Sequence, residues 1–257
     1  MNNKKIFSDL IEVFKYAGKI SLVLRSKGLK KEIKNDNTPV SNGDLEVNKI
    51  LSEKISKLTP SIPIVSEENS DNKDRSNLEN FWLIDPIDGT YDYINDGDEF
   101  TLNAALIINK KAVAGIVYAP AKERLFYTFG DGKSYEINKK NIKEIKCEKK
   151  TKKNEIIAVS YSKVLNPEIQ NIHKLNNVTE YVRMKSSLKF CVIAAGDFDF
   201  YAAEPRACEW DIAAGHAVLL NAGGTITDFD GNEIIYGKKN FKNPSIILKR
   251  NKYLNNE

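Results

Sequence analysis

The stretch over residues 81–90 constrains this chain more than any other, because an apolar run leads directly into a carboxylate. Phe81-Trp82-Leu83-Ile84 precedes Asp85, which predicts a buried strand that ends at an acidic side chain. Pro86 disfavours the helical region for the residue before it, so the strand should stay extended up to Asp85 and then turn. A fold that buries this strand must therefore present Asp85 at the strand's carboxyl end.

The turn that follows carries further groups suited to binding. Asp88 adds a second carboxylate, Gly89 lets the backbone approach a ligand closely, and Thr90 adds a hydroxyl. Two carboxylates this close repel each other unless a positive charge lies between them. Mg²⁺ is the obvious candidate, because it takes oxygen ligands from few carboxylates together with phosphate and water. The alternative is a tight turn whose aspartates cap the backbone.

Acidic residues mark the ends of other predicted elements. A short apolar strand at residues 62–65 leads into Glu67 and Glu68, and Asp211 lies at the start of an alanine-rich helix over residues 212–221. At a helix N-terminus, a carboxylate and the free amides could jointly hold a cation and an anion. These acids make a metal site more probable than a simple capped turn.

The remaining motifs narrow the chemistry. His173 and His216 have no other soft ligand near them in the sequence, which argues against zinc catalysis. The chain has no phosphate-binding G-x-x-x-x-G-K-[ST] loop, no dinucleotide fingerprint and no G-x-S-x-G elbow. An all-oxygen ligand set with a threonine hydroxyl fits metal-assisted hydrolysis of a phosphate ester.

The net charge and the cysteine content indicate which partners and which cellular compartment suit this chain. The net charge is +4, and the lysine-rich stretches at residues 27–34, 139–153 and 238–242 are expected to be solvated surface rather than a nucleic-acid site. Three cysteines without C-x-x-C spacing suit a reducing cytosol. No apolar run approaches the roughly 20 residues that span a bilayer. We expect a cytoplasmic monomer or homodimer without an integral membrane segment; peripheral association with the inner membrane is left open.

The pattern of apolar residues predicts mixed helices and strands. Helices are expected over residues 6–24, 42–58, 167–175, 189–195 and 212–221, and strands over 62–65, 81–85, 101–108, 112–119, 124–129, 133–137, 155–160, 178–183, 199–203 and 246–248. Ser41 should cap the second helix, with Asp44 in its first turn explained equally well by the helix dipole. Serines should also cap the helix at 189–195, and residues 225–227 and 233–236 should form a hairpin. Lysine-rich residues 147–154 suggest a boundary between an N-terminal metal-site subdomain (1–150) and a tightly packed C-terminal α/β subdomain (151–257).

Three motifs in order carry a resemblance to a known superfamily. Asp85-Pro86-Ile87-Asp88-Gly89-Thr90, with Glu67-Glu68 upstream and Trp210-Asp211 downstream, resembles the lithium-sensitive, Mg²⁺-dependent phosphomonoesterases that include the inositol monophosphatases. The finer pattern resembles bacterial 3′(2′),5′-bisphosphate nucleotidases of the CysQ type. The stretches that carry it are Asp36-Asn37-Thr38-Pro39-Val40, residues 59–68, Ser186-Ser187-Leu188-Lys189-Phe190-Cys191 and residues 210–217.

The resemblance implies a fold, a reaction and a set of roles. The fold would be α/β (α+β layered), with alternating helix and sheet layers in an α-β-α-β-α sandwich. The reaction would convert adenosine 3′,5′-bisphosphate to AMP and phosphate in support of sulfur assimilation; an inositol or sugar phosphatase and a catalytically silent nucleotide-binding protein are the alternatives. Two or three Mg²⁺ ions would be held by Glu67, Asp85, the Ile87 carbonyl, Asp88 and Asp211. Asp44 and Thr90 would activate water, with Glu68 as a helper acid. Substrate would contact Gly89, Thr90, Ser186, Ser187, Lys189, Arg206 and Asp211.

One loop departs from the expected pattern. Glu204-Pro205-Arg206-Ala207-Cys208-Glu209 stands before Trp210 where a different sequence is expected for the CysQ type. Because this loop would adjoin the part of the substrate that leaves, substrate preference is the property most affected by the departure.

Overall fold

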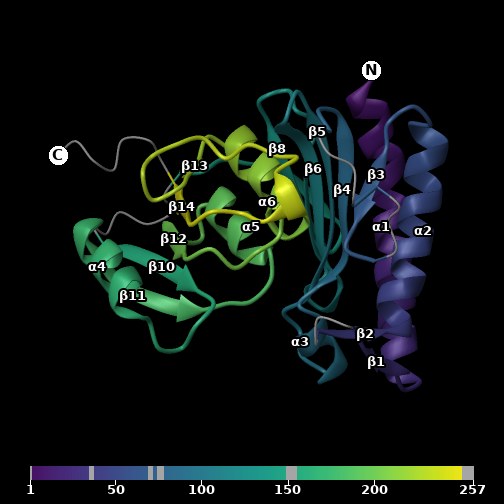
Figure 1. Ribbon diagram of the computed structural model, residues 1–257, viewed down its shortest axis with the longest axis horizontal. Coiled ribbons are helices and arrows are strands. Elements are labelled where there is room, and N and C mark those ends of the chain that lie inside the picture. The colour runs from purple at the N-terminus through teal and green to yellow at the C-terminus, as the bar shows by residue number, and fades with distance from the viewer. Residues whose placement is uncertain (1, 35–37, 69–71, 74–77, 149–154, 251–257) are drawn as a thin grey trace.

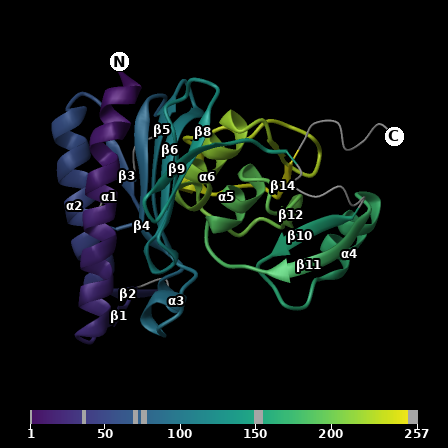
Figure 2. The same ribbon diagram turned by 180° about the vertical axis from the view of Figure 1, so that it is seen from behind.

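The computed structural model describes residues 2–34, 38–68, 72–73, 78–148 and 155–250, and these form five alternating layers. Helices cover both faces of a large sheet and both faces of a smaller one (Figures 1 and 2). The outer helix layer is α1 (Asn3–Ser26) and α2 (Asn42–Leu58), the middle layer is α5 (Leu188–Ala194) and α6 (Glu209–Asn221), and the far layer is α4 (Pro167–Leu175). The layered α-β-α-β-α arrangement expected from the sequence is confirmed.

The large sheet has seven strands in the order β3-β4-β5-β6-β7-β8-β9. Its strands are β3 (Ile64–Ser66), β4 (Phe81–Asp88), β5 (Thr101–Ile108), β6 (Lys111–Ala119), β7 (Arg124–Thr128), β8 (Ser134–Asn138) and β9 (Asn141–Ile145). β3 and β4 are parallel, and every later neighbour is antiparallel, as the predicted meander requires. β9 was not predicted, because four of its five residues are exposed at the sheet edge and give no apolar alternation.

Strand β4 continues past Asp85, where the sequence predicted that it would end. Asp85 pairs with Asn103, and Asp88 pairs with Thr101, so one extra residue on β4 forms a bulge. Pro86 lies within this bulge, where its missing N–H leaves no gap in a regular ladder. Residues three apart on a regular strand point to opposite faces, but the bulge changes that alternation and lets both aspartates approach one site.

The outer helices bury their apolar faces on this sheet. On α1, Phe7 lies 5.5 Å from Trp82 between ring centroids, and the Trp82 indole N–H donates to the Thr59 hydroxyl at 2.9 Å. Each fully buried side chain of this size contributes about 2–3 kcal/mol. Ser41 caps α2 as expected: its hydroxyl accepts from the Gly43 N–H, and Asp44 accepts from the Ser41 N–H in return.

Several short elements lie between the main helices and strands along the chain. β1 (Lys31–Ile33) and β2 (Pro39–Ser41) form an antiparallel pair beside α2, and α3 (Thr90–Ile94) follows β4. Single 3₁₀ turns occur at η1 (Pro120–Lys122) and η2 (Lys239–Phe241). Gly89 immediately precedes α3 and has a φ of 93°, a left-handed conformation that only glycine adopts without strain.

The smaller sheet has five strands in the order β11-β10-β12-β14-β13. They are β10 (Ile156–Ser160), β11 (Val178–Arg183), β12 (Phe200–Ala203), β13 (Thr225–Thr227) and β14 (Ile246–Lys249). β10 is parallel to both β11 and β12, so these three strands end at the same edge. That edge faces the region where β4 ends, and loops leaving it can reach the carboxylates.

The predicted hairpin of residues 225–227 with 233–236 is wrong. β13 pairs with β14 instead, and residues 233–236 form no strand. The cause is the fully buried carboxylate of Glu209 in α6, which accepts hydrogen bonds from the amides of Gly237 and Lys238. Tyr236 is also anchored, with its hydroxyl 2.7 Å from Nδ1 of His216. These contacts hold the segment against α6.

Helix α6 joins the two sheets. It packs against β4, β5 and β6 on one side and against α5 on the other. Gly115 of β6 permits this close approach, because a Cβ there would lie 2.6 Å from the Ala214 carbonyl oxygen. One core cluster accordingly includes residues of both sheets. The proposed division near residue 150 therefore remains a prediction, and part of its lysine-rich boundary lies outside the described residues.

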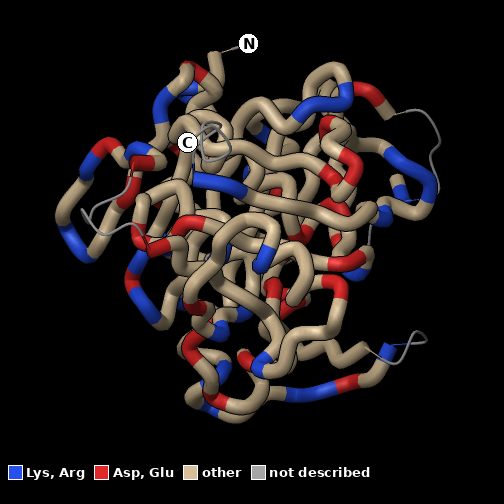
Figure 3. Tube along the Cα trace, turned by 90° about the vertical axis from the view of Figure 1, so that its left-hand side faces the viewer, with Lys and Arg blue, Asp and Glu red and all other residues tan. Residues whose placement is uncertain are grey.

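Two further properties concern the surface. Basic and acidic residues interleave along the chain in the side view of Figure 3. Among the described residues, no helix combines the length and the apolar character needed to cross a bilayer.

Candidate active site

Three carboxylates from separate elements converge. Oxygens of Glu67, Asp85 and Asp211 lie within 4.8 Å of one another. Glu67 follows β3, Asp85 lies in β4 and Asp211 lies in the first turn of α6. The parallel pairing of β3 with β4 and the packing of α6 on β4 bring them together. This cluster could hold a metal ion.

Asp85 is the least satisfied member of the cluster. Its side chain is almost fully buried, and within the described residues no hydrogen-bond donor reaches either of its oxygens. Burial first, and then the charges of Glu67, Asp88 and Asp211, raise the pKa of Asp85 well above its usual value. A buried carboxylate without a donor is costly unless a cation binds it, so this side chain fits a metal ligand.

The pKa values of the neighbouring aspartates, Asp88 and Asp211, are raised as well. Burial, followed by Asp88 and Glu67, raises the pKa of Asp211 to about 8. Burial also raises the pKa of Asp88 to about 6, although Lys189 acts against this rise. The Cys208 N–H donates to Asp211 at 2.7 Å and fixes the carboxylate at the start of α6. A main-chain amide thus holds the Asp211 carboxylate close to the other negatively charged side chains of the cluster.

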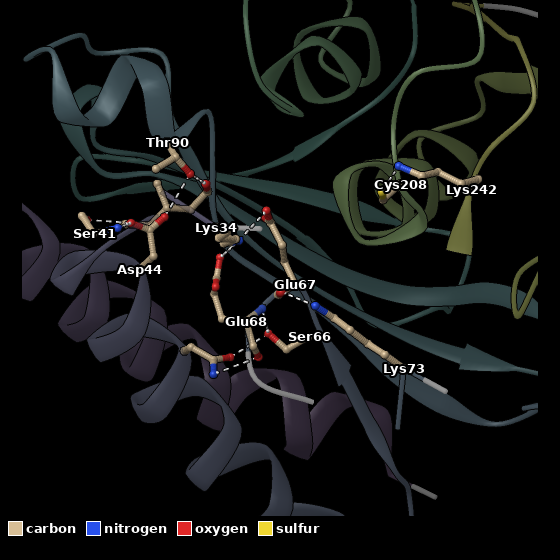
Figure 4. Close-up of polar contacts among 12 residues, drawn as sticks. Lys34, Ser41, Asp44, Ser66, Glu67, Glu68, Lys73, Thr90, Cys208 and Lys242 are labelled. Carbon is tan, nitrogen blue, oxygen red and sulfur yellow. Dashed lines mark hydrogen bonds and ion pairs between the residues drawn. The ribbon is translucent and has the colours of Figure 1, made fainter. Parts of the chain in front are cut away.

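Two lysines contact the glutamates after β3. Figure 4 shows Lys34 between Glu67 and Glu68, with its Nζ 3.2 Å from Oε1 of Glu67 and a shorter contact to Glu68. Lys73 donates to the main-chain carbonyl of Glu67, and its Nζ lies 5.0 Å from the ring centroid of Trp210. Neither lysine was predicted from the sequence, since each stands among other charged residues.

Asp44 and Thr90 form a short hydrogen-bonded chain beside the cluster. The Thr90 hydroxyl lies 3.0 Å from Oδ1 of Asp44 and 3.0 Å from the Ile87 carbonyl oxygen (Figure 4). The other oxygen of Asp44 accepts from the Ser41 N–H at 2.8 Å and from the Ser41 hydroxyl at 2.6 Å. Burial raises the pKa of Asp44, and its hydrogen bonds partly oppose that rise. Asp44 therefore caps α2 and orients Thr90 at once.

The two serines before α5, Ser186 and Ser187, make different contacts. The Ser187 N–H donates to Asp88, but the Ser187 side chain does not cap the helix. Its hydroxyl lies instead 2.7 Å from Oδ1 of Asn103 and 2.9 Å from the hydroxyl of Thr101, both in β5. Ser187 therefore provides no cap, because two polar side chains of the neighbouring sheet compete for its hydroxyl. The Ser186 hydroxyl does accept from the first amide of the helix, the Leu188 N–H, at 3.4 Å, so the predicted serine cap holds for Ser186 alone. Ser187 links α5 to the bulge of β4.

A cavity of about 330 Å³ opens beside the carboxylates. Of the residues predicted to bind substrate or metal, those lining it are Asp88, Gly89, Ser186, Ser187, Lys189, Arg206 and Asp211. Glu67, Asp85, Asp44, Glu68 and Thr90 do not line it, and the carboxylate cluster meets the cavity through Asp88 and Asp211. The cavity can therefore admit a small molecule with one end at the metal-binding acids.

Comparison with known proteins shows to which family the chain belongs. The family model described as the inositol monophosphatase family matches residues 2–256. The chain belongs to the inositol monophosphatase family. Members of this family with similar sequences include the 3′(2′),5′-bisphosphate nucleotidase CysQ of Buchnera aphidicola, 31% identical over 91% of this chain and 88% of the relative. CysQ of Aggregatibacter actinomycetemcomitans is 30% identical over 95% of this chain and 92% of that protein.

Solved structures of the family show the same fold. The crystal structure of CysQ from Bacteroides thetaiotaomicron superposes with a TM-score of 0.76 and 27% identity, covering 93% of this chain and 94% of that one. An inositol monophosphatase from Thermotoga maritima also gives 0.76, at 23% identity over 95% and 91% of the two chains. The resemblance inferred from the sequence motifs is confirmed.

The cavity also contains residues that the sequence did not single out. Further lining residues include Tyr161, Arg183, Lys185 and Asn243, and Glu204 of the loop already noted in the sequence also lines it. Tyr161 follows the end of β10, and Glu204 follows the end of β12, so the carboxyl edge of the parallel strands was the available signal. Using that signal requires knowledge of which strands are parallel neighbours. Strand pairing cannot be read from one amino-acid sequence.

Proposed function

We propose that this protein is a Mg²⁺-dependent phosphatase that converts adenosine 3′,5′-bisphosphate to AMP and phosphate. The observation that carries this proposal is the buried, donorless carboxylate of Asp85, clustered with Glu67 and Asp211 next to a cavity that also presents cations. Two relatives with similar sequences are named 3′(2′),5′-bisphosphate nucleotidase CysQ, which supports this choice of substrate. A role in sulfur assimilation and a cytoplasmic location belong to the same proposal.

The proposed ligands of two or three Mg²⁺ ions are all oxygens. They are the carboxylates of Glu67, Asp85, Asp88 and Asp211 and the carbonyl of Ile87. This donor set fits Mg²⁺, which prefers hard oxygen ligands. A bound divalent ion would supply positive charge that polarises the phosphate and makes a water molecule more acidic. The raised pKa values of the aspartates would fall again with that charge in place.

Thr90 and Asp44 are proposed to orient the attacking water. The Asp44 carboxylate is fixed by two hydrogen bonds from Ser41 and can accept the Thr90 hydroxyl proton. The lone pairs of the Thr90 oxygen are then free to accept a hydrogen bond from water. Glu68 is assigned a helper role: together with Glu67 it holds Lys34, whose charge lies next to the cluster.

The remaining groups are proposed to hold the substrate. The amides of Gly89 and Thr90 would bind the phosphate that is removed. Ser186, Ser187, Lys189 and Arg206 would lie along the rest of the nucleotide, with the two cations suited to a second phosphate. Because the metal cluster treats phosphate monoesters alike, these groups must provide the selectivity.

A substrate panel tests the proposal. Phosphate release from adenosine 3′,5′-bisphosphate, inositol 1-phosphate and fructose 1,6-bisphosphate is measured with Mg²⁺ and with excess EDTA. We expect the highest kcat/KM for the bisphosphate nucleotide and no turnover in EDTA. A higher kcat/KM for inositol 1-phosphate would replace the nucleotidase assignment by that of an inositol phosphatase. Binding of the nucleotide without any turnover would indicate a silent binding protein.

A further inference from the structure

A stacked pair of side chains forms part of the cavity wall. Cζ of Arg206 lies over the ring of Tyr161, 3.5 Å from its centroid, which is a close cation–π contact. Tyr161 follows β10, and Arg206 lies in the loop between β12 and α6. β10 and β12 are parallel neighbours, so residues that follow their ends meet at one edge. The pair therefore depends on the fold of the smaller sheet.

The guanidinium of Arg206 is held by the ring and by little else. Across the described residues, Arg206 forms neither an ion pair with a carboxylate nor a hydrogen bond to the protein. Stacking occupies the face of a guanidinium and leaves its N–H groups free at the edge. Such an edge can bind the oxygens of a phosphate through two parallel hydrogen bonds. The Tyr161 ring thus sets the orientation in which Arg206 presents its donors.

A second cation lies on the same aromatic group. Nζ of Lys189 is 5.9 Å from the ring centroid of Tyr161 and 5.3 Å from that of Tyr201. Lys189 is buried and donates to the Ser186 carbonyl. Two like charges beside one ring repel each other, and an anion placed between them would relieve that repulsion. The arrangement suits a ligand with a second anionic group.

The pair also lines a second cavity. A smaller cavity of about 120 Å³ shares Tyr161, Tyr201 and Arg206 with the larger one. Without the Tyr161 ring, the long side chain of Arg206 would gain freedom to turn into that volume. The ring therefore restricts Arg206 as well as attracting it.

We propose that Tyr161 is a positioning residue that confers selectivity for phosphate esters with a second phosphate group, by holding Arg206 flat beside Lys189. This inference rests on the proposed function, because it assigns the selectivity of that same site. Tyr161 touches Arg206 and need not touch the substrate. Its loss should therefore affect binding of the second phosphate and leave the chemical step unchanged.

The test compares two substrates that differ only in the second phosphate, adenosine 3′,5′-bisphosphate and adenosine 3′-monophosphate. Tyr161→Leu should raise KM for the bisphosphate by about threefold to tenfold, since a cation–π contact of this kind is modest in size. For this variant kcat, and both constants for the monophosphate, should stay within about twofold of wild type. Tyr161→Phe and Tyr161→Trp keep an aromatic face and should behave like wild type.

The matched control is Tyr181→Leu, because Tyr181 is also 40% exposed and lies on the neighbouring strand β11 without lining either cavity. In an Arg206→Ala background, Tyr161→Leu should have no further effect. Equal losses for both substrates, a loss confined to kcat, a Phe variant as impaired as the Leu variant, or additive losses in the double variant would each overturn the inference.

Binding of 5′-AMP, measured by calorimetry with Mg²⁺, separates this inference from the proposed reaction. If the wild type releases no phosphate but binds 5′-AMP, and Tyr161→Leu weakens that binding while Tyr181→Leu does not, the inference stands and the reaction is wrong. If the wild type does not bind 5′-AMP, or if Tyr161→Leu binds it as tightly as wild type, the inference fails.

Discussion

The acidic and the cationic parts of the site are built in different ways. Asp85 and Asp211 are placed by backbone features, a bulge in β4 and the first turn of α6. Arg206 is an exposed side chain on a loop and is oriented by the ring of Tyr161. The comparison suggests that the chemistry is fixed by the main chain, whereas substrate choice depends on side chains that orient one another. Changes in the acidic part should therefore affect all substrates, and changes in the cationic part should affect only some.

The largest effect should follow Asp85→Asn. Removing this charge weakens the proposed metal cluster, so turnover of every phosphate ester should fall by at least about 100-fold, which is roughly 2.7 kcal/mol of activation free energy. In EDTA the same variant should melt at a higher temperature than wild type, because three like charges lose one repelling partner. Initial rates at saturating Mg²⁺ and melting curves provide the measurement. Asp131→Asn, in an exposed turn, is the control; more than a tenth of wild-type turnover in Asp85→Asn would exclude an essential ligand.

Thr90→Val should have the next largest effect. The hydroxyl is proposed to orient water, which matters in the transition state and little for substrate binding, so kcat should fall by about 10- to 100-fold while KM changes by less than about threefold. Thr90→Ser keeps the hydroxyl and should retain most of the activity. Steady-state kinetics on two substrates checks this, and a change limited to KM would leave Asp44 as a helix cap alone.

Arg206→Ala tests whether the cationic part of the site affects substrate selectivity and not the chemical step. Loss of a charge-assisted contact should lower kcat/KM for adenosine 3′,5′-bisphosphate by about tenfold or more, while kcat/KM for inositol 1-phosphate stays within about twofold. Arg206→Lys keeps the charge without the planar stack and should fall between the two. Equal losses for both esters would contradict the separation of chemistry and selectivity.

The smallest effect concerns the stability of the metal-free protein. The pKa of Asp88 is raised to about 6 and that of Asp211 to about 8, so these groups favour the folded state when protonated and lose that contribution as the pH rises. Between about pH 4 and pH 8, the melting temperature in EDTA should therefore fall, because the protons that these buried carboxylates hold in the folded state are lost over this range. Mg²⁺ should remove most of this fall at pH 8. A melting temperature that rises over the same range in EDTA would contradict the crowding of these acids.

The sequence predicted the carboxylates and the cations Lys189 and Arg206, but not the side chains that contact these charges, for a physical reason. The carboxylates lie at the ends of apolar strands or at a helix start, and both features are readable from neighbouring residues. Lys34 and Tyr161 acquire their contacts only when separate elements meet, so local patterns contain no sign of them. The same limit applies to the fold: the strand at 225–227 was found, but its partner depends on Glu209, which binds the amides of a segment 28 and 29 residues away.

The central claim of the proposed mechanism is that Asp85, whose buried carboxylate accepts no hydrogen bond from the described residues, binds a cation. Anomalous diffraction from crystals soaked in Mn²⁺, an ion with similar oxygen preference, locates that cation without reference to activity. We expect an anomalous peak bounded by the carboxylates of Glu67, Asp85 and Asp211, and its loss in Asp85→Asn crystals. A fully occupied Mn²⁺ site elsewhere, with Asp85 not coordinated, would contradict it.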